Sequence, residues 1–175
     1  MPNNIKGKTF YQNPAIDILF GNMNYKIPSK REDFKPVEVA AVFEDGAEQL
    51  LKDFYQKKPS SKSVQEFEYY IRNLITDSAY EEKKIKKPGL VEVAISITLK
   101  KERYFDVDVD NIAKTVLDSI KGYLFDDDSQ VKRVICDKNI HALNIDGFFI
   151  SVTELTATRK GLMGDYFLFS ETKPK

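Results

Sequence analysis

The stretch that decides the fold is Val91-Glu92-Val93-Ala94-Ile95-Ser96-Ile97-Thr98-Leu99. Its large apolar side chains occupy every second position, and a period of two is typical of a β-strand with one face in a core. A Pro88-Gly89 turn signal precedes the stretch, and charged residues follow it from Lys100. We therefore predict a strand over residues 91–99 at the centre of the fold.

Helical spacing of apolar residues occurs on both sides of this strand. Before it, Ser63 and Glu66 form a capping-box pattern at the start of an apolar stripe that runs to Ile75. After it, a helix is predicted over residues 111–124. A further helix is predicted over residues 47–54, because Asp45 and Glu48 have capping-box spacing. Apolar runs predict other strands at residues 37–43, 131–136 and 148–155.

The resulting order is strand, helix, helix, strand, helix, strand, strand. It predicts the α+β class, with a small mixed β-sheet packed with helices. We expect residues 1–36 to form an irregular N-terminal extension with a weak strand-like stretch at residues 16–20. Residues 37–157 form the predicted domain. Residues 158–175 are expected to be a poorly packed C-terminal tail, in which residues 166–169 are the segment that can dock.

Composition restricts the class of protein. The chain has 175 residues, of which 42% are hydrophobic and 31% charged, enough apolar material for one folded domain. Cys136 is the single cysteine and no secretory segment is recognisable, so we expect a cytoplasmic location. No apolar run reaches the length of a membrane helix. No glycine-rich phosphate loop is present, and no nucleotide cofactor is expected.

Aspartates gather on both sides of the helix predicted over residues 111–124. Asp108 and Asp110 are two apart in an extended segment, so their side chains share a face. Asp110, Lys114 and Asp118 follow at intervals of four and line one face of the helix. Asp127 and Asp128 come after its end.

Carboxylates placed this closely repel one another unless a cation neutralises them. Mg²⁺ is commonly held by one or two carboxylates together with waters and substrate phosphate oxygens. Such an ion polarises a phosphodiester and activates water. The pattern therefore predicts a divalent-metal site at Asp108, Asp110 and Asp128, with Lys114 stabilising charge that develops on the phosphate.

Simpler explanations exist for each residue taken alone. An aspartate before a helix is often only its N-cap, and an Asp/Lys pair four residues apart is often a solvent-exposed ion pair. A calcium loop of the EF-hand type is excluded by spacing, since the required glycine and glutamate are absent. A single cap explains one aspartate, whereas this region carries several.

The pattern Asp-x-Asp-Asn-x-x-Lys-x-x-x-Asp-x-x-x-Gly runs from Asp108 to Gly122 and is followed by Asp127-Asp128-x-Gln-Val. It resembles the RusA family of Holliday junction resolvases, over roughly residues 60–157. The resemblance implies a RusA-like endonuclease domain over residues 37–157 and a homodimer that nicks four-way DNA junctions with Mg²⁺, or with Mn²⁺ in its place. It implies that Asp108, Asp110 and Asp128 bind the metal and that Lys114 is the essential lysine.

Other residues are given lesser roles. Lys100, Lys101, Arg103 and Asn111 are candidates for DNA contacts, and Asp118 and Asp127 for support of the site. Asp127 stays an alternative to Asp128 as the third ligand, because the run of three aspartates lets the pattern slide. A non-catalytic junction-binding or interaction module with the same fold is the alternative function, motivated by a net charge of zero. A phosphoesterase acting on nucleotides or other DNA structures is a third.

Overall fold

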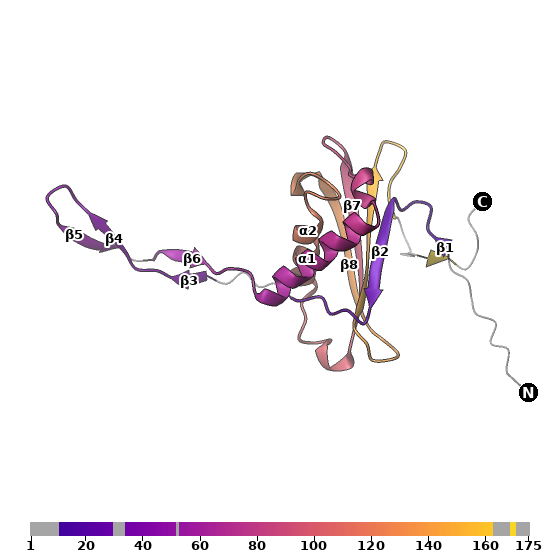
Figure 1. Cartoon of the computed structure of the whole chain (residues 1–175), viewed down its shortest axis with the longest axis horizontal. Helices are drawn as coiled ribbons and strands as arrows, with labels where there is room; N and C mark the ends of the chain where they lie inside the picture. Colours follow the sequence, from indigo (N-terminus) through magenta and orange to yellow (C-terminus); the bar gives the residue numbers. More distant parts are fainter. Residues whose placement is uncertain (1–10, 30–33, 52, 163–168, 171–175) are drawn as a thin grey trace, which may run out of the picture.

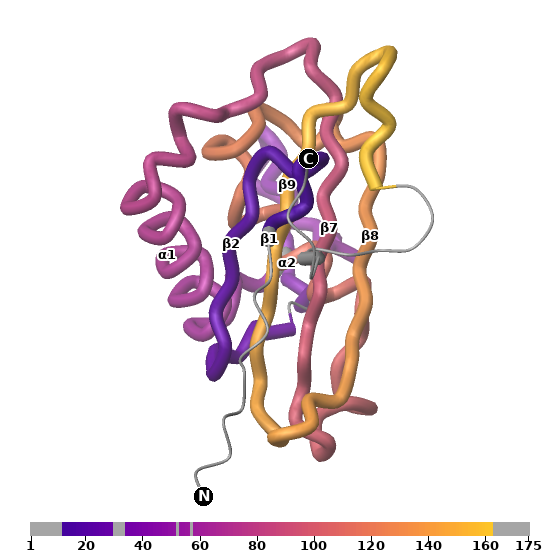
Figure 2. Tube along the Cα trace, turned by 90° about the vertical axis from the view of Figure 1, so that its right-hand side faces the viewer, coloured from indigo at the N-terminus to yellow at the C-terminus, as the bar shows by residue number. Residues whose placement is uncertain are grey.

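The computed structural model describes residues 11–29, 34–51, 53–162 and 169–170. Its centre is a four-stranded sheet in the order β2 (Ile18–Met23), β9 (Gly147–Leu155), β7 (Leu90–Leu99) and β8 (Val131–Ile140). β7 runs parallel to β8 and antiparallel to β9, and β9 is antiparallel to β2. Figure 2 shows these four strands side by side. The sheet is mixed and accompanied by helices, which confirms the predicted α+β class.

The alternating stretch forms β7 and lies inside the sheet, as predicted. β7 has a strand on each side, and Val93 lies opposite Val134 of β8 and Val152 of β9. The alternating apolar positions of the predicted stretch are all buried, namely Val91, Val93, Ile95, Ile97 and Leu99, whereas Leu90 at the start of β7 is exposed. The opposite face is covered as well, since Glu92 and Ala94 are each 1% exposed.

Two helices, α1 (Lys62–Asp77) and α2 (Val109–Ile120), lie on one side of this sheet (Figure 1). α2 connects the parallel strands β7 and β8 and packs against both α1 and β8. Apolar side chains of the two helices and of β2, β7 and β9 form one core. The helices therefore bury the apolar stripes that the spacing predicted, including Phe67 and Ile71 of α1 and Ile112 and Val116 of α2.

The ends of the helices differ from the prediction. Ser61, and not Ser63, is the N-cap residue of α1, and it makes no side-chain cap hydrogen bond. α2 ends at Ile120, four residues earlier than expected. The reason is a turn at Gly122, whose φ of 83° is a conformation that few residues other than glycine adopt.

The helix predicted over residues 47–54 is wrong, because this segment belongs to a β-hairpin. β4 (Val39–Val42) pairs with β5 (Glu48–Leu51), and β3 (Phe34–Pro36) pairs with β6 (Tyr55–Lys57), both antiparallel. We call residues 34–57 the arm; the structure does not describe Lys52 within it. Figure 1 shows the arm projecting away from the sheet and helices.

The turn of the arm explains the error. Asp45 does not cap a helix; its Oδ1 accepts a hydrogen bond from the backbone N of Ala47 at 3.0 Å. Gly46 has a φ of 78°, which suits a tight turn between strands. An Asp-Gly pair flanked by apolar residues is itself a strong hairpin signal, and here it prevailed over the helical spacing.

The irregular structure predicted for residues 1–36 is also wrong where β2 forms. Ile18 and Phe20 of β2, together with Ile16 before it, are buried against the rest of the sheet. The weak alternation noted at residues 16–20 thus marks an edge strand. Residues 1–10 and 30–33 lie outside the described part of the chain.

The segment after β9 is bound to the body, contrary to the poorly packed tail expected there. An ion pair of 2.7 Å joins Arg159 to Asp17, and the backbone N of Leu162 donates a 2.7 Å hydrogen bond to buried Glu92. Of the segment expected to dock, residues 166–168 lie outside the described residues. Phe169–Ser170 form β10, which pairs with β1 (Tyr11–Gln12).

No helix in the described parts of the chain has both the length and the apolar character needed to span a membrane.

Candidate active site

The loop between β7 and α2 carries the first half of the predicted site, and it is firmly held. After a short 3-10 helix, η2 (Lys101–Arg103), Arg103 forms an ion pair of 2.6 Å with Asp146 and donates to the carbonyl oxygen of Ile27 at 3.2 Å. Lys138 of β8 donates to the carbonyl oxygens of Tyr104 and Val107 at 2.8 and 2.7 Å. These bonds fix the backbone that leads into Asp108.

Asp108 and Asp110 lie at the start of α2, and both are exposed. Asp108 occupies the N-cap position but makes no side-chain cap hydrogen bond. Its carboxylate instead accepts a 3.3 Å hydrogen bond from the side-chain amide of Asn111. Asp110 lies in the first turn of α2, and Lys114 follows one turn later with an exposed side chain. Asn111 therefore orients the carboxylate of Asp108, which makes no cap hydrogen bond to the helix.

The second half of the predicted site lies beyond the other end of α2. Asp128 begins the 3-10 helix η3 (Asp128–Gln130), and its carboxylate accepts a 2.8 Å bond from the Nζ of Lys121, the C-cap residue of α2. This bond, ahead of the negative charges of Asp128, Asp118 and Asp127, raises the pKa of Lys121. Asp118 thus belongs electrostatically to this end of the helix.

Asp126 and Asp127 have structural partners. Asp126 forms a 2.9 Å ion pair with Lys84. Asp127 caps η3 through the backbone N of Ser129 at 3.0 Å, and Lys87 lies 3.6 Å from its carboxylate. Hydrogen bonds from Ser129 and the charge of Lys87 lower the pKa of Asp127 to about 2. Of the three neighbouring aspartates, Asp128 is the one that is bonded to the C-cap residue of α2, Lys121.

Gln130 belongs to the motif but was given no role in the prediction, and the structure shows that it is buried. It is 2% exposed, its Oε1 accepts from the backbone N atoms of Asp126 and Asp127, and its Nε2 donates to the carbonyl oxygens of Ile85 and Gly89. The signal was present, since Asp127-x-x-Gln130 is a capping-box spacing. Gln130 holds the aspartate turn in place.

Within one chain, the structure places Asp108 and Asp110 far from Asp128, the third predicted metal ligand. α2 has 12 residues, and at 1.5 Å per residue it is about 18 Å long. Asp108 and Asp110 lie at one end of this length, and Asp128 is bonded to the other end. Among the described residues, no three His, Cys, Asp or Glu side chains are close enough together to hold a metal ion. Asp108 and Asp110 alone remain as neighbouring candidate ligands.

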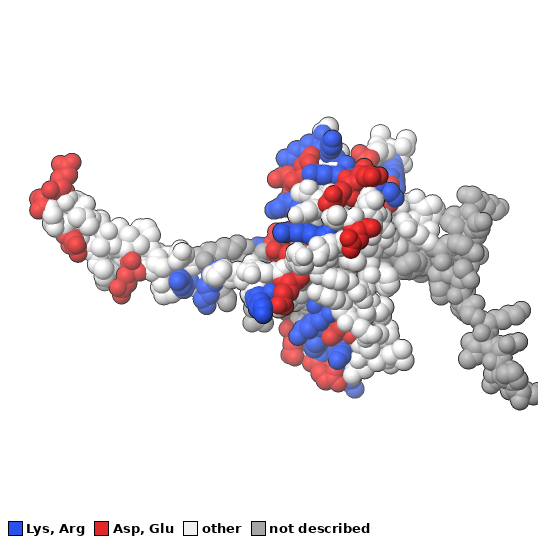
Figure 3. Space-filling view, viewed as in Figure 1, with Lys and Arg blue, Asp and Glu red and all other residues white. Residues whose placement is uncertain are grey.

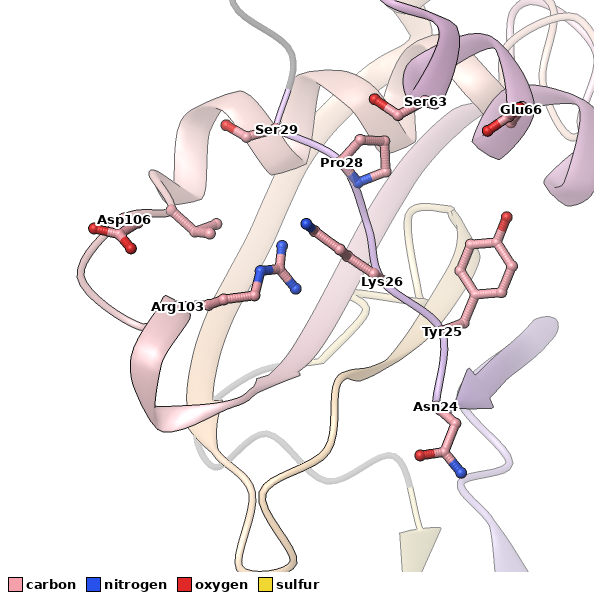
Figure 4. A pocket seen from close by; sticks show the side chains of 10 residues that line it. Asn24, Tyr25, Lys26, Pro28, Ser29, Ser63, Glu66, Arg103 and Asp106 are labelled. Carbon is pink, nitrogen blue, oxygen red and sulfur yellow. The ribbon is translucent and has the colours of Figure 1, made fainter.

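A cleft of about 640 Å³ opens beside the loop that leads to Asp108 (Figure 4). Tyr25, Lys26 and Pro28 line it from the segment after β2, Ser63 and Glu66 from α1, and Arg103 and Asp106 from the loop. Lys26 is exposed, whereas Arg103 is already bonded to Asp146 and Ile27. Among the described residues that line the cleft, Lys26 is therefore the exposed cation, and it shares the cleft with Asp106 of the loop.

The basic residues predicted to contact DNA fall into two groups, those that are exposed and those already bonded within the protein. Lys100 and Lys101 are exposed next to the loop, while Arg103 stabilises the loop. Figure 3 shows Lys and Arg side chains gathered with Asp and Glu over the body, and acidic side chains at the far end of the arm. The acidic residues of that end are Glu44, Asp45 and Glu48. Exposed cations occur on the body and also on the part of the arm nearest to it, where Lys35 lies.

No curated protein matches the chain. A family model described as Endodeoxyribonuclease RusA matches residues 49–151, from β5 in the arm through α1, β7, α2 and β8 into β9. The match spans more than half of the chain, which therefore belongs to the RusA endodeoxyribonuclease family.

Proposed function

We propose that this protein is a metal-dependent endonuclease that resolves four-way DNA junctions by paired nicks. The observation that carries the proposal is the exposed Asp108/Asp110 pair at the start of α2, with Lys114 one turn behind it, in a chain of the RusA family. Asp108 directly follows a loop that Arg103 and Lys138 hold in place, and such support is what a preorganised site needs.

The residues at this end of α2 fit a hard divalent cation. Asp108 and Asp110 supply two oxygen donors, and Mg²⁺ needs no more than one or two carboxylates from a protein. When bound, Mg²⁺ or Mn²⁺ supplies Lewis-acid polarisation of the phosphodiester and activation of water. Asn111 keeps the Asp108 carboxylate turned outward for this role.

The lysines near the site interact with the phosphates of the DNA. The ammonium group of Lys114, on the same face as Asp110, stabilises the negative charge that develops on the phosphate. Lys100 and Lys101, exposed on the loop before Asp108, bind neighbouring DNA phosphates and set the position of the strand. These contacts are independent of sequence and weaken with added salt.

Two-fold symmetry accounts for Asp128 in this proposal. A dimer in which two α2 helices run antiparallel brings Asp108 and Asp110 of one protomer beside the partner's Asp128. Each of the two sites is then complete only in the dimer, and a symmetric dimer presents equal sites to two equivalent strands of the junction.

The test is cleavage of a synthetic four-way junction with Mg²⁺. Asp110→Asn and Lys114→Ala are each expected to lower the nicking rate by about 100-fold or more. Asp110→Asn should still bind the junction, because it removes no contact between a cation and a phosphate. Asp77→Asn, an exposed aspartate at the end of α1, is the matched control and should cleave normally. Activity that survives Asp110→Asn contradicts the proposal, and binding without cleavage in any divalent metal favours the non-catalytic module.

Mixing variants tests the shared site. A heterodimer of Asp110→Asn with Asp128→Asn retains one intact site if the ligands come from two protomers, and none if they come from one. We expect the mixture to regain nicking of one strand that neither variant performs alone. Two inactive variants whose mixture stays inactive refute the shared site while leaving the endonuclease assignment intact.

A further inference from the structure

The two most exposed large apolar side chains of the described residues are Phe105, 88% exposed, and Leu143, 77% exposed. They belong to neighbouring loops. The backbone N of Lys101 donates to the side chain of Asn144 at 2.8 Å, and Asn144 in turn donates to Glu102 at 3.3 Å. Figures 1 and 2 both place these two loops at the same end of the sheet. One end of the body therefore carries two apolar side chains in water.

Phe105 is held by a loop that is fixed on both sides of it. Tyr104 before it packs edge-on against the Phe105 ring with a centroid distance of 5.2 Å. Lys138 bonds the carbonyl oxygens of Tyr104 and Val107 and lies 4.6 Å from the Tyr104 ring centroid. Val107 is buried. The exposure of Phe105 is thus a property of an anchored loop.

The position of Phe105 connects it with the proposed site. It lies three residues before Asp108, on the same loop, and shortly after exposed Lys100 and Lys101. A DNA strand whose phosphate reaches Asp108 and whose neighbouring phosphates reach these lysines passes beside the Phe105 ring. Bases of an intact duplex are stacked and offer no free face to such a ring. At a branch point the stack is interrupted, and a base can stack on an aromatic side chain instead.

We infer that Phe105 binds an unstacked base at the branch point and thereby selects branched DNA over duplex, with Leu143 as its apolar neighbour. Stacking of this kind accepts any base, because every base has a π-face. The inference rests on the proposed junction substrate, but it concerns recognition and not cleavage. Phe105 is a specificity residue in this scheme, and no chemical step passes through it.

The test is a four-way junction with 2-aminopurine at the branch point, studied without divalent metal so that no strand is cut. Binding of the wild-type protein is expected to raise the 2-aminopurine fluorescence, because the probe no longer stacks on its neighbouring bases in the DNA. Phe105→Ala should abolish most of this rise and lower the preference for junction over duplex roughly tenfold. Phe105→Tyr should restore both, whereas Phe105→Leu should not. Phe43→Ala, which removes an exposed phenylalanine from the arm, is the matched control and should behave as wild type.

The outcomes separate the inference from the proposed function. A wild-type protein that cleaves junctions while Phe105→Ala keeps full fluorescence and selectivity overturns the inference and leaves the function standing. A protein that never cleaves, yet loses the branch-point signal with Phe105→Ala, keeps the inference and loses the function. A Phe105→Ala variant that turns monomeric in analytical ultracentrifugation identifies the ring as a protein contact and also overturns the inference.

Discussion

Cys136 of β8 is half-buried against the first turn of α2, with its Sγ 3.8 Å from the carbonyl oxygen of Val109. Burial, and secondarily the charge of Asp137, raises the pKa of this thiol to about 11. The thiolate is the reactive form, so the native thiol is expected to react slowly. At about pH 8 its alkylation by iodoacetamide should be roughly 100-fold slower than in strong denaturant, since a rise of two pKa units lowers the thiolate fraction by that factor.

The measurement is direct because Cys136 is the single cysteine of the chain. Mass spectrometry of quenched samples gives the rate in native and denatured protein. Similar rates in the two states would show that the strand opens readily or that the thiol is not shielded.

At the same scale, sequence reasoning located charged residues but not their partners. The spacing of Asp108, Asp110 and Lys114 gave their placement along α2, because a helix has a fixed period. It did not foresee that Arg103 is bonded to Asp146, or Asp128 to Lys121, since both partnerships depend on how the chain returns in space. Distance along a sequence does not show which end of a helix a later residue meets.

The pairing of β2 with β9 depends on Gly21, which lies opposite Phe149. A Cβ at this position would lie 2.3 Å from the carbonyl oxygen of Phe148 and 2.5 Å from Cδ1 of Phe149. Because the first of these atoms is backbone, the strands must move apart to admit it. Gly21→Ala should therefore lower the free energy of unfolding by about 1–3 kcal/mol. For a chain of this size each kcal/mol lowers Tm by about 2–4 °C, which thermal denaturation detects.

Gly46→Ala is the comparison for that experiment. Gly46 has no atom within 4 Å of the added Cβ, and its cost comes from its positive φ at the tip of the arm. It should leave the Tm of the body unchanged. If both variants have the wild-type Tm, the prediction that a Cβ at Gly21 forces β2 and β9 apart is wrong.

Long elements, in which the apolar period recurs several times, were predicted correctly, whereas short elements were not. β7 and the two helices have long apolar periods that only one structure satisfies. Residues 47–54 have four apolar positions, a number too small to separate a helix from a hairpin strand, and the Asp45-Gly46 turn decided the outcome. β2 was hidden for the same reason, because its alternation is brief and its partner strand is distant.

At the scale of the whole molecule, the arm and the body are expected to behave as separate parts. None of the core residues lies between residues 34 and 57, and large apolar side chains of the arm such as Val42, Leu50 and Tyr55 are more than half exposed. Replacing the arm by a short Gly/Ser linker should leave a cooperatively folded body, with Tm within about 3 °C of wild type. Circular dichroism measured during heating gives both the Tm and the cooperativity of unfolding.

A core substitution calibrates this experiment. Phe67→Ala removes a buried ring of α1 and should cost about 3–5 kcal/mol. A fall in the Tm of the armless protein comparable to that of Phe67→Ala would show that the arm contributes to the core after all.

The pairing of β2 with β9 has a consequence for folding during synthesis of the chain. Ile18 lies in register with Val152, so β2 leaves the ribosome long before its neighbouring strand exists. At the usual speed of translation the wait is on the order of 10 s. During that time the apolar side chains of β2 are covered by no native strand. A nascent chain that stalls before Gly147 keeps this edge open to strands of other polypeptides, so rapid completion of synthesis protects the fold.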